Sequence, residues 1–219
     1  MKKFSLVDVA AFVVWLLPLV YLWSVYATLP AIVPVHFGLE GKVDRYGDRS
    51  ELLTLQAILL FVALLVYLLL KFLPAIDPKK QVKVGERTFQ KLALGLLIFI
   101  SAINITILFA TVHQGFKIDK LMLPLMGLLF AFIGNVMHSI KPNYFAGMRT
   151  PWALENEDNW RATHRLAGKL WFTGGIFLTI ATLLLPSTAA YIVFIGTIVI
   201  LTMWPFIFSY RYFKAHQPK

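Results

Sequence analysis

The sequence predicts an all-α integral membrane protein with six transmembrane helices, cytoplasmic N- and C-termini, and a short interfacial helix between spans four and five. Three observations predict this fold. The 219-residue chain is 58% hydrophobic and 15% charged, whereas soluble domains are about 45–50% apolar and about 25% charged. Six apolar stretches reach the length of about 20 residues that crosses a bilayer. The basic residues gather in alternate connections between those stretches.

The composition also excludes several kinds of chemistry. The chain has no cysteine, so disulfides, iron–sulfur clusters, Cys-ligated zinc and thiol nucleophiles are excluded. Its net charge is +10, but cytoplasmic loops of membrane proteins collect Lys and Arg, and this alone produces a basic balance. We therefore expect no direct partner among nucleic acids, and we expect no cofactor.

The six predicted spans follow from the apolar runs. They cover residues 7–27, 51–74, 91–113, 121–139, 167–186 and 188–209. The first run begins like a signal peptide, but its apolar stretch is longer than usual and no small-residue cleavage motif follows it. We therefore expect it to be retained as a span. The last two runs are separated only by a short Pro-Ser-Thr segment, which predicts a tight helical hairpin.

The distribution of basic residues predicts the orientation. With a cytoplasmic N-terminus, 16 of the 21 Lys and Arg residues fall on the cytoplasmic side. The other five are Lys42, Arg45, Arg49, Lys117 and Lys120. The positive-inside rule therefore places both termini in the cytoplasm.

The segment 28–51, on the opposite side, reads TLPAIVPVHFGLEGKVDRYGDRSE. Its prolines and glycines predict an ordered, turn-rich loop that covers the outer ends of the helices. His36, Glu40 and Asp44 are residue types that ligate metals, but their spacing matches no defined metal motif. We favour a structural His and ion pairs within the loop, and the sequence leaves metal binding open.

The cytoplasmic block 140–166 begins where Pro142 ends the fourth span. Thr150 as N-cap and Pro151 at the first helical position predict the start of a short helix. Trp152, Trp160 and Thr163 recur at about helical spacing. We therefore expect this helix to lie along the inner surface, with its Trp rings in the membrane interface.

His164 invites a catalytic interpretation, but no nucleophile, zinc-binding or phosphate-binding motif accompanies it. We favour a structural network of His164 with Glu155, Asn143 or Tyr144. The sequence leaves open whether His164 and Glu155 bind a metal.

Few polar residues fall within the spans. We expect Asn104 and Asn135 to hydrogen-bond between spans three and four, and Lys71 to extend its ammonium group to the membrane surface. The spans carry no carboxylate or Arg at mid-depth. Ion-coupled transport usually needs such a group, so a transporter is disfavoured.

Two segments resemble a known bacterial family. LPAIVPVHFGLEGKVDRYGDR, at residues 29–49, resembles the DUF1648 domain, and GNVMHSIKPNYFAGMRTPWALENEDNWRATHRLAGKLW, at residues 134–171, is similar to the core of the SdpI family. The resemblance implies a DUF1648-like part over residues 1–90, with spans one and two and the loop 28–51. It also implies an SdpI-like part over residues 91–219, with spans three to six and the block 140–166.

The two segments supply the candidate site residues. In the outer loop they are Pro34, His36, Phe37, Gly41, Asp44 and Arg49. In the cytoplasmic block and its flanks they are Asn135, Lys141, Asn143, Tyr144, Arg149, Thr150, Trp152, Glu155, Trp160, Thr163, His164 and Arg165.

The resemblance implies a multi-pass protein of the bacterial cytoplasmic membrane that gives resistance to a secreted antimicrobial peptide toxin. It implies binding of the toxin outside or within the membrane, contact with lipids, and retention of an ArsR-like autorepressor at the cytoplasmic face, without enzymatic activity. Two alternatives stay open at this stage. One is a membrane enzyme acting on lipid or peptide, with His164, Glu155 and Arg149 or with the outer His36, Glu40 and Asp44. The other is a small transporter.

Overall fold

The structure of the chain, a computed structural model, describes residues 5–38, 41–77, 85–113 and 115–216. In chain order its elements are α1 (Leu6–Tyr26), β1 (Ile32–Phe37), β2 (Val43–Asp48), α2 (Arg49–Ile76), α3 (Glu86–Val112), α4 (Asp119–Met137), α5 (Pro151–Glu155), α6 (Glu157–Leu184) and α7 (Ser187–Ala215). Within the described ranges, six helices are long and apolar enough to cross a membrane, and α5 is the exception. The predicted class of all-α multi-pass membrane protein is confirmed.

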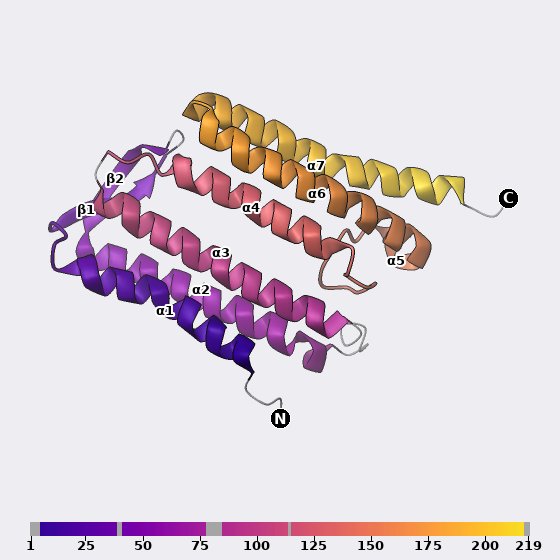
Figure 1. Cartoon of the computed structure of the whole chain (residues 1–219), viewed down its shortest axis with the longest axis horizontal. Coiled ribbons are helices and arrows are strands. Elements are labelled where there is room, and N and C mark those ends of the chain that lie inside the picture. Colours follow the sequence, from indigo (N-terminus) through magenta and orange to yellow (C-terminus); the bar gives the residue numbers. More distant parts are fainter. Residues whose placement is uncertain (1–4, 39–40, 78–84, 114, 217–219) are drawn as a thin grey trace.

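The long helices lie roughly side by side (Figure 1). The two strands lie at one end of the bundle, and the start of α1 and the end of α7 lie toward the other. We call these the hairpin end and the termini end. Which end faces the cytoplasm stays a prediction from the distribution of Lys and Arg.

The first three helices form an N-terminal group that is packed through side chains. Near the hairpin end, a buried apolar cluster joins α1, α2, α3 and β1 through Leu22, Leu52, Leu108 and Val33. Nearer the termini end, a second cluster is made of Ala11, Ala63, Tyr67, Ala93 and Leu97. Ala63 and Tyr67 of α2 are four residues apart, as are Ala93 and Leu97 of α3, which is the spacing of an inward-facing stripe.

The C-terminal group consists of α4, α6 and α7, and its central contact is between backbones. A Cβ atom added at Gly175 of α6 would lie 2.3 Å from the Ala131 backbone nitrogen of α4. One added at Gly134 of α4 would lie 2.3 Å from the Phe172 backbone nitrogen of α6. Small residues at such crossings let membrane helices approach closely. The α7 helix packs on the other side of α6, where the Trp171 indole N–H donates to the Leu201 carbonyl at 2.8 Å.

The segment 28–51 differs from the predicted turn-rich loop, because much of it forms an antiparallel hairpin. β1 pairs with β2 from Ile32 opposite Asp48 to Phe37 opposite Val43, with an irregular register near Pro34 and His36. Proline has no N–H to donate, so it is tolerated where the ladder is irregular. The glycines that suggest turns from sequence lie mainly at the tip and within β2.

The predicted interfacial helix is also shorter than expected. The Thr150 hydroxyl accepts from the Ala153 N–H at 3.2 Å, as its N-cap role predicts, but α5 ends at Glu155. The Asn156 side chain then caps α6 by accepting from the Asn159 N–H at 2.9 Å. This second cap restarts the helix ten residues before the span predicted at 167–186, so Trp160 and Thr163 belong to α6.

Candidate functional site

One polar pair stands out on the hairpin. His36 Nδ1 lies 2.6 Å from Asp44 Oδ1 across the two strands, and both side chains are exposed. Phe37, next to His36, is partly buried. Glu40, the third member of the metal-binding alternative, lies outside the described residues. Among the residues that are described, no three His, Cys, Asp or Glu side chains are grouped to hold a metal ion.

Two of the sequence-selected residues attach the hairpin to the helices. Pro34 is buried, and its carbonyl accepts from the Thr111 hydroxyl of α3 at 3.4 Å. Gly41 has a φ of 68°, and an added Cβ would lie 2.3 Å from Asp119 Oδ1. The Gly41 carbonyl also accepts from the Ile118 N–H at 3.3 Å. Glycine is therefore required here both by the left-handed backbone and by the close approach of α4.

The beginning of α2 is fixed by a capping carboxylate. Asp48 accepts from the backbone N–H groups of Ser50 at 2.8 Å and Glu51 at 3.2 Å. The Ser50 hydroxyl also donates to Asp48, and this bond, followed by the two backbone bonds, lowers the pKa of the Asp48 carboxyl. Arg49 begins the helix, and its guanidinium lies over the Tyr26 ring at 5.5 Å from the centroid. This contact links the start of α2 to the end of α1.

At the termini end, Asn143 builds the loop that follows α4. Its Oδ1 accepts from the N–H groups of Phe145 at 2.7 Å and Ala146 at 2.8 Å. Its Nδ2 donates to the carbonyls of Lys141 at 2.7 Å and Ala146 at 3.2 Å. An Asn side chain that replaces backbone partners in this way stabilises a turn. Asn143 is buried and occupied, so its role in this structure is to shape the loop.

His164 and Trp160 anchor the same loop from inside. His164 is 1% exposed, and its Nε2 accepts from the Met148 N–H at 3.1 Å. Its Nδ1 lies 2.9 Å from the Trp160 carbonyl and therefore carries the proton. The two rings stack at 4.1 Å, and the Trp160 indole donates to the Ile140 carbonyl at 2.8 Å. Gly147, with a φ of 112°, leaves room for the imidazole.

This arrangement corrects two expectations. His164 does not join Glu155, Asn143 or Tyr144, because α6 continues through it and directs it toward Trp160 and Met148. Trp160 is not an interface ring either, since only 1% of it is exposed. Both imidazole nitrogens are hydrogen-bonded to backbone, so His164 is not placed to exchange protons with a substrate. Glu155 and Arg149, its partners in the enzymatic alternative, are exposed.

A neutral network joins α5, α6 and α7. Asn159 Oδ1 accepts from the hydroxyls of Thr163 and Ser209, each at 2.9 Å. Asn159 Nδ2 donates to the Ser209 carbonyl at 3.0 Å, and the Thr150 and Ser209 hydroxyls lie 3.0 Å apart. All four side chains are buried. Asn159 and Ser209 are central to this network although sequence reasoning did not select them, because neither residue type is distinctive without its partners.

The remaining residues of the block divide between surface and interior. Lys141, Tyr144, Phe145 and Arg149 are exposed on the loop, and the Arg149 guanidinium donates to the Tyr144 carbonyl. They form a basic and aromatic surface, which we call the loop surface.

Trp152 packs between this end of α5 and α7, with its ring 5.3 Å from that of Tyr210 and 6.2 Å from that of Phe213. Its indole N–H is buried and has no hydrogen-bond partner within the described ranges. The aromatic contacts therefore hold Trp152 in place without a hydrogen bond from its ring.

Asn135 and Arg165 are exposed and line one groove between α4 and α6. The expected hydrogen bonding of Asn104 and Asn135 between the third and fourth helices is wrong. Asn104 is buried, and its Oδ1 has no hydrogen-bond partner in the part of the chain that the structure describes. Asn135 lies near the termini end of α4, whereas Asn104 lies in the half of α3 toward the hairpin, so the helix axes keep them apart.

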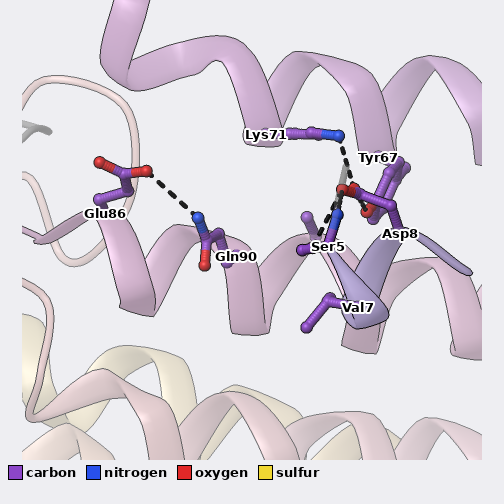
Figure 2. Close-up of a pocket in the computed structure, with 8 residues that line it drawn as sticks. Ser5, Val7, Asp8, Tyr67, Lys71, Glu86 and Gln90 are labelled. Atoms are coloured by element: carbon purple, nitrogen blue, oxygen red, sulfur yellow. Dashed lines mark hydrogen bonds and ion pairs between the residues drawn. The ribbon is translucent and has the colours of Figure 1, made fainter. Parts of the chain in front are cut away.

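Sequence reasoning missed a charged cluster in the N-terminal group (Figure 2). Asp8 of α1 is 7% exposed, and its Oδ1 accepts from Lys71 Nζ at 2.5 Å and from the Tyr67 hydroxyl at 2.7 Å. Ser5 donates to its other oxygen from both N–H and hydroxyl, at 2.9 and 3.0 Å. Lys71 therefore does not simply extend to the surface, as expected, because a carboxylate faces it. The sequence signal was an Asp in the first turn of an apolar helix.

Asp119 is a second acidic residue that sequence reasoning overlooked. It is 1% exposed at the hairpin end of α4, and neither carboxylate oxygen has a hydrogen-bond partner among the described residues. It lies against Gly41 of the hairpin.

These features define a multi-pass helical membrane protein with an exposed hairpin at one end and a polar, loop-forming block at the other. Comparison with known proteins makes this class more specific. The SdpI/YfhL protein family matches residues 139–209, and the domain of unknown function DUF1648 matches residues 13–60. The resemblance predicted from the motifs is confirmed. The part boundary at residues 90 and 91 stays a prediction, and it falls within α3.

Similar proteins occur in bacteria and archaea. The chain is 22% identical over 194 residues to Immunity protein SdpI of Bacillus subtilis (strain 168), covering 86% of this chain and 87% of the relative. It is 38% identical over 63 residues to an uncharacterized protein of Archaeoglobus fulgidus, covering 29% of this chain and 32% of the relative. No solved structure matches the chain.

Proposed function

We propose that this chain is a membrane immunity protein that gives resistance to a secreted antimicrobial peptide by binding it at the hairpin end. The observation that carries this proposal is the similarity to Immunity protein SdpI along most of both chains. The expected site is the cytoplasmic membrane, with the hairpin facing outward, as the distribution of basic residues predicts. Binding of a peptide, rather than catalysis, fits a block whose buried His164 has both ring nitrogens occupied.

The hairpin offers a peptide both charge and a hydrogen-bonding edge. His36, Asp44 and Arg45 are exposed, and Tyr46 is 57% exposed. Arg45 pairs with Glu51 at 2.5 Å, with both side chains well exposed. Exposed pairs contribute little to stability, so these groups can exchange partners when a charged peptide arrives.

An apolar cavity lies beside the hairpin and suits the other face of an amphipathic peptide. Its volume is about 560 Å³, and it is lined by residues of α1 and α2 that include Leu19, Trp23 and Leu53. Trp23 is 87% exposed. Arg49 directly follows β2, and its guanidinium lies over the Tyr26 ring. Tyr26 also lines the cavity, so the cavity is next to the end of the hairpin. A peptide lying at the membrane surface could therefore contact charged strands and apolar helices together.

The proposal is tested by resistance in a sensitive host. Cells that express the chain are exposed to purified secreted antimicrobial peptides, one at a time, and the minimal inhibitory concentration is measured. We expect protection against at least one peptide, and its loss in Trp23→Ala and Arg45→Ala. The matched control is Trp204→Ala, which removes an exposed Trp of α7. Equal loss in the control, or full protection by both hairpin-end variants, contradicts peptide binding at this end.

The loop surface favours a second step, in which a cytosolic ArsR-like repressor is held at the membrane. Exposed Tyr144 and Phe145 lie beside Lys141 and Arg149, and aromatic and Arg side chains are enriched in protein interfaces. The test is co-sedimentation of an ArsR-like repressor, encoded beside the gene, with membranes that contain the chain. We expect less repressor with Tyr144→Ala and unchanged repressor with Arg211→Ala on α7. Unchanged retention in Tyr144→Ala rejects this surface.

A further inference from the structure

A groove of about 340 Å³ lies between α4 and α6 at the termini end. Its polar lining consists of Asn135 and His138 from α4 with Arg165 and Lys169 from α6. Arg165 and Lys169 are one helical turn apart, so they lie on the same face of α6. The groove therefore gathers two permanent cations, a histidine and an amide.

Within the described residues, no acidic side chain pairs with the basic side chains of this groove. None of the residues that line it is acidic. In the part of the chain that the structure describes, neither Arg165 nor Lys169 makes an ion pair, whereas Arg161 on the preceding turn is paired with Glu157 at 2.6 Å. The His138 Nε2 lies 3.2 Å from the neighbouring Ser139 hydroxyl. An anion entering the groove would therefore meet an Arg and a Lys side chain and no carboxylate among the residues that line it.

The hollow exists because the helices touch without side chains between them. A Cβ added at Gly168 would lie 2.9 Å from the Gly134 carbonyl, and both glycines line the groove. Phe172 follows one turn deeper and is 45% exposed, and Ile176 beyond it is 39% exposed. The groove therefore has a cationic mouth at the end of the helices and continues into an apolar face in the span.

Asn135 and Arg165 differ from several other motif residues of the block in their exposure and hydrogen bonding. Five other motif residues, Asn143, Thr150, Trp160, Thr163 and His164, are buried and hydrogen-bonded within the protein. Asn135 and Arg165 are exposed, and no described side chain bonds them. Their side chains are therefore available, together with Lys169, to bind a ligand in the groove.

We propose that this groove binds the headgroup of an anionic glycerophospholipid. The phosphodiester would accept from Arg165, Lys169 and Asn135, and one acyl chain would lie along Phe172 and Ile176. A lipid fits better than a soluble phosphate, because the apolar face below the cations continues into the membrane-spanning part of α6. Basic pockets between membrane helices are known to recognise such headgroups. This inference is independent of peptide binding at the hairpin end.

The test compares two double variants of the full chain. Delipidated protein in detergent is titrated with phosphatidylglycerol, and bound lipid is counted by native mass spectrometry. Arg165→Gln with Lys169→Gln removes the two cations of the groove. Arg211→Gln with Lys214→Gln removes an Arg and a Lys from the same end of α7, outside the groove.

Each basic group near a membrane surface contributes roughly a fivefold increase in affinity, so the groove variant should bind about 30-fold more weakly. The α7 variant should stay within about twofold of the parent.

Four results would overturn the proposal. The first is unchanged binding in the groove variant, and the second is an equal loss in the α7 variant. The third is equal binding of phosphatidylethanolamine with the same acyl chains. The fourth is displacement of the lipid by inorganic phosphate at millimolar concentration. If the double variant does not fold, the single variant Lys169→Gln is tested instead, and its lipid affinity should fall about fivefold. Matching thermal unfolding of the lipid-free variants and parent verifies that they fold.

Discussion

The two halves of the bundle are held together by different contacts. In the N-terminal group, α1, α2 and α3 meet through apolar side chains and through the Asp8–Lys71 pair. In the C-terminal group, α4 and α6 meet backbone to backbone at glycines, and α6 and α7 are joined by the neutral network around Asn159. Steric changes should therefore damage the second half, whereas changes of charge should damage the first.

The two ends of the bundle also differ in how exposed their motif residues are. Five of the twelve candidate residues at the termini end are buried and hold the loop and the neighbouring helices in place: Asn143, Thr150, Trp160, Thr163 and His164. The motif residues of the hairpin include the exposed His36–Asp44 pair, and the neighbouring Arg45 and Tyr46 are exposed as well. A motif that is specific in sequence can thus record a folding requirement rather than a contact to a partner.

The largest expected effect is steric. In Gly175→Ala, the new methyl group meets the Ala131 backbone, which cannot yield as a flexible side chain does. We expect a loss of about 3 kcal/mol or more in the free energy of unfolding, at the upper end for overpacking. Denaturant titration in mixed micelles measures it. Gly196→Ala on α7 is the control, because nothing lies within 4 Å of the added atom. Equal stability of the two variants contradicts backbone contact between α4 and α6.

The next effect is electrostatic and belongs to the N-terminal group. Lys71→Met leaves the nearly buried Asp8 without its cation, and we expect a loss of about 2–3 kcal/mol, less than for a fully buried pair. The double variant Asp8→Asn with Lys71→Met should recover most of this loss, because no charge is then left behind. A double variant as unstable as the single one would show that Lys71 acts through its packing.

Asn159→Ala tests the neutral network of the C-terminal group. The hydroxyls of Thr163 and Ser209 lose their acceptor in the interior. We expect a loss of about 1–2 kcal/mol in the same unfolding assay, since each bond between membrane helices contributes less than a buried ion pair. Asn156→Asp serves as control, because a carboxylate also caps a helix. Stability equal to the parent would mean that the network is not needed.

Trp160→Phe removes one hydrogen bond and keeps the aromatic stack on His164. The Ile140 carbonyl loses its indole donor, so we expect a loss of about 1 kcal/mol. Indole fluorescence is altered by the substitution itself, so unfolding is followed by far-ultraviolet circular dichroism. A loss as large as that of Gly175→Ala would indicate that Phe cannot occupy the site and would reject the assignment to a single hydrogen bond.

The smallest effect on stability is expected for His36→Ala. The His36–Asp44 pair is exposed, so its removal should change the free energy of unfolding by no more than about 0.5 kcal/mol. Resistance to the peptide should nevertheless fall if the hairpin contacts it. Asp158→Ala, an exposed change on α6, is the control for resistance. A large loss of stability in His36→Ala would place the pair among the structural contacts and weaken the comparison between the two ends.

Several features were predictable because they depend on neighbouring residues. The spans follow from apolar length, and the α5 start follows from Thr150 and Pro151, whose capping roles are local. The family resemblance follows from short contiguous motifs. The hairpin was missed because its strands are short and interrupted by Pro34. The early start of α6 was missed because the cap at Asn156 looks like part of a polar loop.

The sequence by itself determined the number of helices, the two polar segments and the likeness to SdpI, since hydrophobic length and local capping act over a few residues. Only the tertiary structure decided that Asp8 faces Lys71, that His164 supports a loop, and that Arg165 and Lys169 share an unbalanced groove with α4. These contacts join residues that are far apart in the chain, or depend on which side chains a neighbouring helix leaves exposed. The physical reason is that burial and pairing are set by the surfaces of packed helices, which no single stretch of sequence contains.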